Sequence, residues 1–189
     1  MTKCVPTAIP DVKILVPQRH GDARGYFSET YNRRVLAEAG IGVDFVQDNE
    51  SLSAEVGTIR GLHFQTPPFE QAKLVRVLTG AIFDVAVDLR AGSPSYGRYV
   101  AVRLSAEEGN QLFIPAGFAH GLCTLEPDTR VFYKVDRHYS ADHDAGIIWN
   151  DTDIGIEWPV SAEEAILSGK DRLLPGLAGF HSPFTYVNS

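Results

Sequence analysis

The chain has 189 residues, which suits one domain and can bury about 70% of the surface of the unfolded chain. Its 44% hydrophobic and 22% charged residues exclude wholesale disorder, and two cysteines exclude a disulfide framework. Seventeen basic and 24 acidic residues give a net charge of −7, without the basic stripe of a nucleic-acid binder. The apolar runs are shorter than the ~20 residues of a membrane span, and the N-terminus lacks a signal-peptide pattern, so we expect a soluble, cytoplasmic protein without membrane partners.

The first half of the chain predicts short strands and one helix. Residues 1–20 are expected to form an N-terminal strand or arm, with the strand at residues 12–16. Ser28 is the expected N-cap of a helix over residues 29–39, which Gly40 ends. Residues 73–78 and 81–89 are apolar runs around Thr79-Gly80, a pattern that predicts a β-hairpin. In the second run, Asp84 and Asp88 alternate with apolar residues, so one face of that strand is apolar.

The second half predicts more strands of the same kind. They are expected near residues 99–104, 111–114, 121–125 and 130–135, with turn signals between them. A turn every ~10 residues is typical of an all-β sandwich or barrel. Ser161 and Glu164 match a capping box that would open a short helix ending near residue 168. Residues 176–189 are expected to form an irregular tail of the same single domain, residues 1–189.

Several kinds of catalytic site find no support in the sequence. The chain contains no Gly-x-Ser-x-Gly, no Gly-x-Gly-x-x-Gly and no phosphate-binding Gly-x-x-x-x-Gly-Lys motif. Metal-binding β-barrels usually place two histidines one residue apart, so that both point to one strand face. His63 is flanked at that spacing by Gly61 and Gln65. We therefore expect no metal.

The remaining polar residues suit acid–base chemistry. His63 and His120 lie in apolar, glycine-flanked segments, and histidine titrates near neutral pH. Tyr133 is a candidate acid, Lys73 can stabilise an oxyanion, and Asp171 or Asp84 could hold a histidine tautomer. If residues 58–65 form a regular strand, Arg60, Leu62 and Phe64 face one way and Ile59, Gly61, His63 and Gln65 the other. These groups together favour proton abstraction next to a carbonyl, although each residue alone could be an ordinary core or surface residue.

A series of short motifs, taken in order, points to one family. The motifs cover residues 22–29, 47–49, 60–65, 71–75, 84–90, 92–94, 115–121, 133–134, 158–159 and 167–171. Each motif is weak alone, but the ordered set spans most of the chain and is highly specific. The sequence resembles the dTDP-4-dehydrorhamnose 3,5-epimerases of the cupin superfamily. The resemblance implies an all-β, cupin-type jelly roll with a few short helices.

The resemblance also implies a substrate and roles for particular residues. The substrate would be dTDP-4-dehydro-6-deoxy-D-glucose, whose C4 ketone acidifies the protons at C3 and C5. His63 would remove each proton while paired with Asp171, Lys73 would stabilise the enolate, and Tyr133 would return a proton from the opposite face. Neither a metal nor an organic cofactor is implied. The residues implied to bind the substrate are Arg24, Phe27, Glu29, Gln47, Asp48, Asn49, Arg60, Lys73, His120, Tyr139, Asp144 and Lys170.

The sequence departs from the family pattern at two positions and leaves alternatives open. Glu50 stands where the family commonly has His, and Asp144 where it typically has Glu. A relative that inverts only C3 or only C5 would carry the same proton-transfer residues. A cupin that binds a sugar nucleotide without catalysis is a third hypothesis, although it would be expected to lack one of these groups.

Family members pair into homodimers, often with N-terminal strands crossing between subunits, and residues 12–16 could form such a strand. The implied ligand is a nucleotide diphosphate, which is negatively charged like the chain as a whole, so the net charge would repel it. Positive charge must therefore be local, and Arg24, Arg60, Lys73 and Lys170 can supply it.

Overall fold

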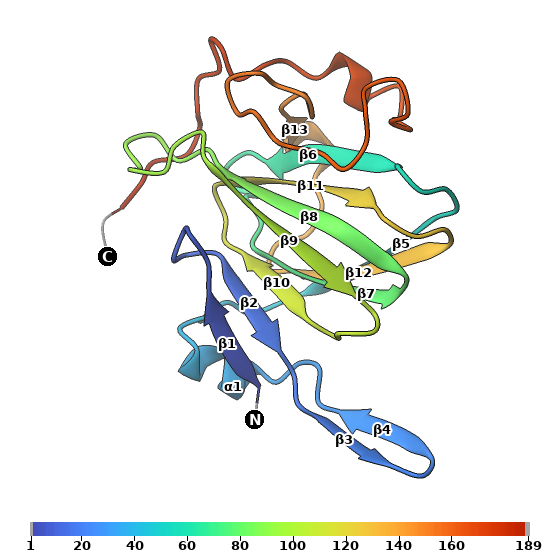
Figure 1. Ribbon diagram of the computed structural model, residues 1–189. Coiled ribbons are helices and arrows are strands. Elements are labelled where there is room, and N and C mark those ends of the chain that lie inside the picture. The colour runs from blue at the N-terminus through green and yellow to red at the C-terminus, as the bar shows by residue number, and fades with distance from the viewer. Residues whose placement is uncertain (1, 188–189) are drawn as a thin grey trace.

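The computed structural model describes residues 2–187 and builds them mainly from antiparallel strands (Figure 1). One sheet has six strands in the order β1-β2-β10-β7-β12-β5, and a second has five in the order β13-β6-β11-β8-β9. The strands of the first sheet are β1 (Lys3–Pro6), β2 (Lys13–Val16), β10 (Gln111–Ile114), β7 (Lys73–Thr79), β12 (Thr129–Val135) and β5 (Gln47–Ser53). Those of the second are β13 (Asp144–Gly146), β6 (Ile59–Gln65), β11 (Phe118–Thr124), β8 (Ala81–Asp88) and β9 (Tyr99–Ser105). The prediction of an all-β fold with few short helices is confirmed.

The two sheets pack face to face around a continuous apolar core. This core draws on β7, β10 and β12 from the first sheet and on β8, β9 and β11 from the second. Alternate residues along each strand point to one face, so each of these strands contributes only every second side chain. The core members include Val75, Leu112, Val131, Ile82, Leu104 and Phe118.

Strand β8 is buried on both of its faces. Ile82 and Ala86 belong to the core between the sheets, whereas Val85, Val87 and Leu89 pack beneath the C-terminal segment. That segment contributes buried Ile147, Ile154 and Phe184, and it lies over the second sheet in Figure 1. Asp84 and Asp88 are consequently fully buried rather than on a solvated face.

The β-hairpin predicted at Thr79-Gly80 is wrong, because β7 and β8 belong to different sheets. The chain turns a tight corner there. Gly80 has φ +79°, and a Cβ at this position would collide with Thr129. Apolar alternation describes the faces of the two strands but not their partners, so a corner between sheets looks like a hairpin in sequence.

Both predicted helices differ from the structure. The helix α1 (Arg33–Glu38) starts later than expected, because Asn32 Oδ1 accepts from the amides of Arg34 and Val35, at 3.0 and 3.4 Å. Ser28 instead ends strand β4 (Gly25–Ser28). The other helices in the described residues are the 3₁₀ turns η1 (Ala141–His143) and η2 (Asp171–Leu173).

The capping box at Ser161 forms only in part and opens no helix. The Ser161 amide donates to Glu164 Oε2 at 3.3 Å, but the Glu164 amide donates to the Ser161 carbonyl rather than to Ser161 Oγ. Ser161 Oγ donates to Glu164 Oε2 at 3.0 Å, and the chain makes a single turn. Ile166 then forms a parallel bridge with Thr58, so tertiary pairing draws the backbone out of the helix. Local capping signals fix the first turn only, and packing decides whether a helix continues.

The N-terminal segment forms strands within its own chain. Strand β2 pairs with β1 and with β10, which leaves β1 at the edge of the sheet. The strands β3 (Arg19–Asp22) and β4 form a separate hairpin that projects from the body, on the side opposite β6 and β13 (Figure 1).

Residues 176–187 contain no helix, and their one β-bridge joins Thr185 to Ala91. Met1 of the expected arm and Asn188 and Ser189 of the expected tail lie outside the described residues. No helix in the described part of the chain is long and apolar enough to cross a membrane.

Candidate active site

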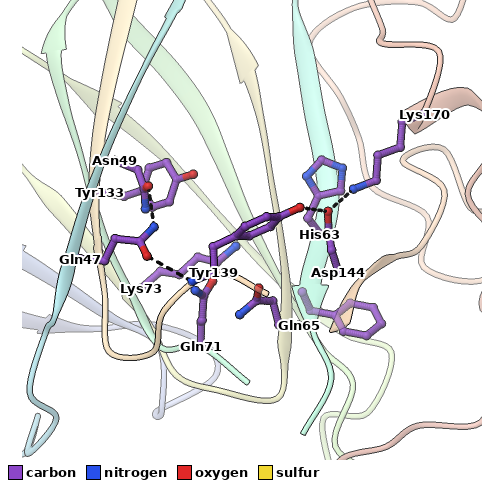
Figure 2. Close-up of a pocket in the computed structure, with 11 residues that line it drawn as sticks. Gln47, Asn49, His63, Gln65, Gln71, Lys73, Tyr133, Tyr139, Asp144 and Lys170 are labelled. Atoms are coloured by element: carbon purple, nitrogen blue, oxygen red, sulfur yellow. Dashed lines mark hydrogen bonds and ion pairs between the residues drawn. The ribbon is translucent and has the colours of Figure 1, made fainter. Parts of the chain in front are cut away.

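A polar cleft opens between the two sheets, at the end where β5, β7 and β12 face β6, β11 and β13. Two adjoining cavities of about 270 and 240 Å³ form the cleft. Both are lined by His63, Lys73, Tyr133 and Lys170. Figure 2 shows His63 on one side of the first cavity and Tyr133 on the other. The structure thus brings together the groups that the sequence singled out for acid–base chemistry.

His63 is paired with a buried carboxylate. Its Nε2 lies 2.6 Å from Asp171 Oδ1, and Asp171 is only 3% exposed. Burial lowers the pKa of His63, while the charge and the hydrogen bond of Asp171 act in the opposite direction. A histidine with a lowered pKa is neutral near pH 7 and can accept a proton. Of the two carboxylates that the sequence offered for His63, the structure selects Asp171.

Asp84 pairs with the other histidine. His120 is the direct cross-strand partner of His63, and its Nε2 lies 2.8 Å from Asp84 Oδ1. Asp84 is fully buried, and its Oδ2 has no hydrogen-bond partner among the described residues. Asp84 thus pairs with His120 through one oxygen, and it also acts electrostatically on Lys73.

A bulge between β6 and β11 sets which side chains of β6 enter the cleft. The register pairs His63 with His120 but Arg60 with Leu122, so one residue of β6 is extra. Gly61 lies at this shift with φ +118°, and a Cβ there would be 2.6 Å from Gly121 Cα. Arg60 and His63 therefore line the same cavity. The expectation that they face opposite ways was wrong, because bulges re-aim side chains.

Lys73 and Tyr133 reach the cleft from the six-stranded sheet. Tyr133 stands opposite Asn49 on β5 and opposite Val75 on β7. Burial lowers the pKa of Lys73 to about 8, partly offset by the charges of Asp84 and Asp144. Burial raises the pKa of Tyr133, partly offset by Arg60. At neutral pH the cleft thus holds a protonated phenol and an ammonium opposite the histidine.

Linked polar side chains line the first cavity (Figure 2). Gln47 Nε2 donates to Asn49 Oδ1 at 2.8 Å, and Gln47 Oε1 accepts from the Tyr139 amide at 3.1 Å. The Tyr139 hydroxyl donates to Asp144 Oδ2 at 3.1 Å, and Lys170 Nζ donates to the same oxygen at 2.5 Å. One methylene shorter than Glu, Asp144 still reaches both neighbours.

Four residues expected to bind substrate lie away from this cleft. Arg24, Phe27 and Glu29 lie on or just after the projecting hairpin and are exposed. Arg24 pairs with Asp22 at 2.5 Å, and Phe27 is 72% exposed. Asp48 alternates with Gln47 and Asn49 on β5, so it points outward and forms an ion pair with Lys134 at 2.8 Å.

The structure adds lining residues that the sequence reasoning did not select. Gln65 is buried and holds the segment that carries Tyr139, because its Oε1 accepts from the Ser140 amide at 2.7 Å. The alternation already placed Gln65 on the strand face of His63, and that shared face could have marked it as a lining residue. Ser51 likewise lies two residues after Asn49 and therefore on the same strand face. The others are Phe64, Gln71, Leu122 and Ser168. Within residues 2–187, no three His, Cys, Asp or Glu side chains are grouped as metal ligands.

Comparisons with known proteins agree with this geometry. Residues 6–179 match the family model described as dTDP-4-dehydrorhamnose 3,5-epimerase. A protein of that name from Sinorhizobium fredii is 52% identical over 180 residues, covering 95% of this chain and 92% of its own length.

Two solved structures also superimpose closely. The dTDP-4-dehydrorhamnose 3,5-epimerase of Bacillus anthracis, with TDP and PPi bound, gives a TM-score of 0.91 at 54% identity and covers 94% of this chain and 100% of its own. The dTDP-6-deoxy-D-glucose-3,5-epimerase of Legionella pneumophila, in complex with dTDP-4-keto-L-rhamnose, gives 0.94 at 38% identity and covers 100% of both chains. The cupin-type jelly roll is thereby confirmed, and the chain belongs to the dTDP-4-dehydrorhamnose 3,5-epimerase family of isomerases.

Proposed function

We propose that this enzyme inverts C3 and C5 of dTDP-4-dehydro-6-deoxy-D-glucose, giving dTDP-4-dehydro-L-rhamnose for dTDP-L-rhamnose biosynthesis. The observation that carries the proposal is the arrangement of the cleft. A carboxylate-paired histidine and a tyrosine line it from opposite sheets, and a lysine with a pKa of about 8 lines both cavities with them. This arrangement suits proton removal from one face of a sugar ring and proton return from the other.

His63 starts each half of the reaction as the general base. Its ring takes the proton from the carbon next to the C4 ketone, and the two electrons of that C–H bond form the enolate. Asp171 stabilises the resulting imidazolium through the 2.6 Å hydrogen bond. General base catalysis of this kind contributes about 10²–10⁴-fold in rate.

Lys73 and Tyr133 complete each inversion. The ammonium of Lys73 stabilises the negative charge on the enolate oxygen, in a partly desolvated site where such charges interact strongly. Tyr133 donates its phenolic proton to the opposite face of the carbon, and the stereocentre is inverted. The raised pKa of Tyr133 keeps that proton in place until the carbanion forms. Between the two inversions His63 releases its proton to solvent and Tyr133 takes one up, so the same residues can act at C3 and at C5.

Binding of the nucleotide diphosphate requires local positive charge in an acidic protein. Arg60 donates to Ser53 Oγ at 3.2 Å and to the Leu52 carbonyl at 3.1 Å. Both acceptors are neutral, so within the described residues its charge is not cancelled by an ion pair. We assign Arg60 and His120 to the sugar diphosphate and the Gln47–Asn49 side of the cleft, with Tyr139, Asp144 and Lys170, to the rest of the nucleotide sugar.

Solvent-deuterium NMR tests the reaction directly. The enzyme is incubated with the dTDP-keto sugar in D₂O, and deuterium should appear at both C3 and C5 with inverted configuration. Exchange at neither carbon would refute the proposal. Inversion at a single carbon would show a mono-epimerase instead. A His63→Asn variant should lose turnover, and wild-type turnover in that variant would refute the role of His63 as the base. Binding of the dTDP-sugar without turnover by the wild type would show a non-catalytic binding protein.

We further propose that the enzyme is a homodimer in which each β3–β4 hairpin serves the partner's cleft. The β3–β4 hairpin projects from the body on the side opposite β6 and β13 (Figure 1), and neither Arg24, Phe27 nor Glu29 lines either cavity of its own chain. The projecting hairpin exposes Tyr26 and Phe27 at 61% and 72%. The edge strand β1 offers further unpaired backbone groups.

Complementation between a binding-impaired variant and a catalytically inactive variant, assayed at low substrate concentration, tests this assembly. An Arg24→Ala chain keeps an intact cleft, and a His63→Asn chain keeps an intact hairpin. If the hairpin acts in trans, each mixed dimer should therefore regain one of its two sites, formed by the cleft of the Arg24→Ala chain and the hairpin of the His63→Asn chain. Absence of recovery in mixtures that are shown to exchange subunits, or a monomer by light scattering, would refute it.

The exposed thiol of Cys4 is free, which suits a reducing compartment, and we propose that the enzyme works in the cytoplasm. Cell fractionation checks this location.

A further inference from the structure

The β3–β4 hairpin has almost no apolar support of its own. Every residue from 20 to 27 is exposed, and only Arg19 and Ser28, at its base, are partly buried. None of its residues belongs to an apolar core cluster. An isolated two-stranded hairpin is marginally stable at best in water. Polar contacts at the base must therefore set the direction in which the hairpin projects.

Arg19 makes those contacts. Its Nη2 donates to the Ala106 carbonyl at 2.6 Å, and its Nη1 donates to the Glu107 carbonyl. The guanidinium also lies 4.3 Å from the centre of the Tyr26 ring on the other strand of the hairpin. One side chain thus joins both strands of the hairpin to the turn between β9 and β10.

The turn that receives Arg19 is itself rigidly held. Asn110 is buried, and it accepts from the Ser105 amide at 3.1 Å and donates to the Arg103 carbonyl at 2.9 Å. Gly109, with φ +66°, leaves the space that the guanidinium occupies, since a Cβ there would lie 2.5 Å from Arg19 Nη2. The hairpin is therefore joined to a fixed point of the jelly roll.

A second contact holds the chain after the hairpin. Gln111 is 1% exposed, and its Nε2 donates to the Thr30 carbonyl at 2.8 Å. A cavity of about 90 Å³ remains between these two contacts, lined by Arg19, Tyr26 and Arg76 among others. Because the base of the hairpin is not tightly packed, the directional hydrogen bonds of Arg19 carry the orientation.

We propose that Arg19 is a positioning residue for nucleotide binding in the cleft of the partner subunit. It fixes the β3–β4 hairpin so that Arg24, Phe27 and Glu29 are presented in the geometry that binds the nucleotide. This inference rests on the proposed dimer, in which the hairpin serves the partner's cleft. Arg19 does not contact the substrate. Its loss raises the cost of ordering the hairpin on binding and leaves the proton-transfer groups untouched.

The chemistry of the contact requires arginine. A guanidinium is a planar fork that donates to two acceptors at once, whereas an ammonium is a point charge. Two adjacent carbonyls of the same turn match that fork. We therefore expect Arg19→Lys to restore only part of what Arg19→Ala loses.

Steady-state kinetics of the full-length dimer test the proposal. Arg19→Ala should raise KM about tenfold, equivalent to ~1.4 kcal/mol, with kcat changed less than twofold. Arg19→Lys should give an intermediate KM. Amide hydrogen exchange in residues 19–28 should accelerate in Arg19→Ala, while the midpoint of thermal unfolding stays unchanged because the hairpin buries no core. An arginine away from this turn serves as control: Arg33→Ala removes an exposed ion pair with Asp44 and should leave both constants unchanged.

The outcomes separate this inference from the proposed dimer site. If Arg24→Ala raises KM and Arg19→Ala does not, the positioning role fails and the hairpin's role stands. If Arg24→Ala leaves KM unchanged, the hairpin does not bind nucleotide and both proposals fail. A fall in kcat at constant KM in Arg19→Ala would also overturn the positioning role, because it would place the effect on the chemical step.

Discussion

The pairing of Asp171 with His63 makes a quantitative prediction for Asp171→Asn. The substitution keeps the shape of a buried side chain and removes its charge. A hydrogen bond to a charged partner contributes about 1.5–3 kcal/mol, and each ~1.4 kcal/mol in the barrier is tenfold in rate. Loss of the charge alone should therefore lower kcat about 10- to 150-fold.

The tautomer of His63 sets the upper limit of the effect. With Asp171 bound at Nε2, the nitrogen left to act as base is Nδ1. If the amide nitrogen of the substituted side chain faces Nε2, the ring proton moves to Nδ1, which can then no longer accept a proton from the substrate. Misassignment of this kind costs about 10⁴ in kcat when the aspartate of a Ser-His-Asp triad becomes asparagine. The expected loss thus lies between about 10-fold and 10⁴-fold.

The pH profile gives an independent check. The base must be neutral, so activity falls as the pH drops through the pKa of His63. Asp171 acts to raise that pKa, against the larger lowering effect of burial. Asp171→Asn should therefore move the acidic limb of kcat/KM to lower pH while the plateau falls.

The assay is deuterium incorporation at C3 and C5 across a pH series, and exposed Asp153→Asn is the matched control. An unmoved acidic limb, or a loss smaller than about threefold, would refute the pairing as part of the mechanism.

Three further predictions follow from the cleft and its framework. Tyr133→Phe should abolish inversion while His63 still exchanges solvent deuterium with retention, and NMR that finds inverted product would contradict the role of Tyr133. Activity should fall as the pH rises through about 8, where Lys73 loses its charge; Lys73→Arg should lack this alkaline limb, and an unchanged limb would assign it to another group. Gly61→Ala places a Cβ 2.6 Å from Gly121 Cα and should lower the free energy of unfolding by about 1–3 kcal/mol in urea, whereas exposed Gly169→Ala, with open space around its Cβ, should not.

The sequence alone determined the chemistry and the class of fold. Short alternating strands between turn signals predict an all-β sandwich, because alternation reports the two faces of each strand. His63, Lys73, Tyr133 and Asp171 were identifiable from the ordered motifs, and the structure places all four around one cleft. The residue type of a side chain decides whether it can accept or donate a proton, and the sequence gives the residue type directly.

Only the tertiary structure decided where those residues face. The bulge at Gly61 brings Arg60 into the same cavity as His63, and the corner at Gly80 sends β7 and β8 into different sheets. Both outcomes depend on partners distant in the chain, Gly121 and Thr129, which local patterns do not contain. The position of Arg24 away from the cleft also depends on a partner distant in the chain. The β9–β10 turn, which accepts the hydrogen bonds of Arg19, sets the direction of the β3–β4 hairpin. Period-2 alternation assigns each residue to one of the two faces of its strand. Which residues that face contacts depends on the register with the neighbouring strand.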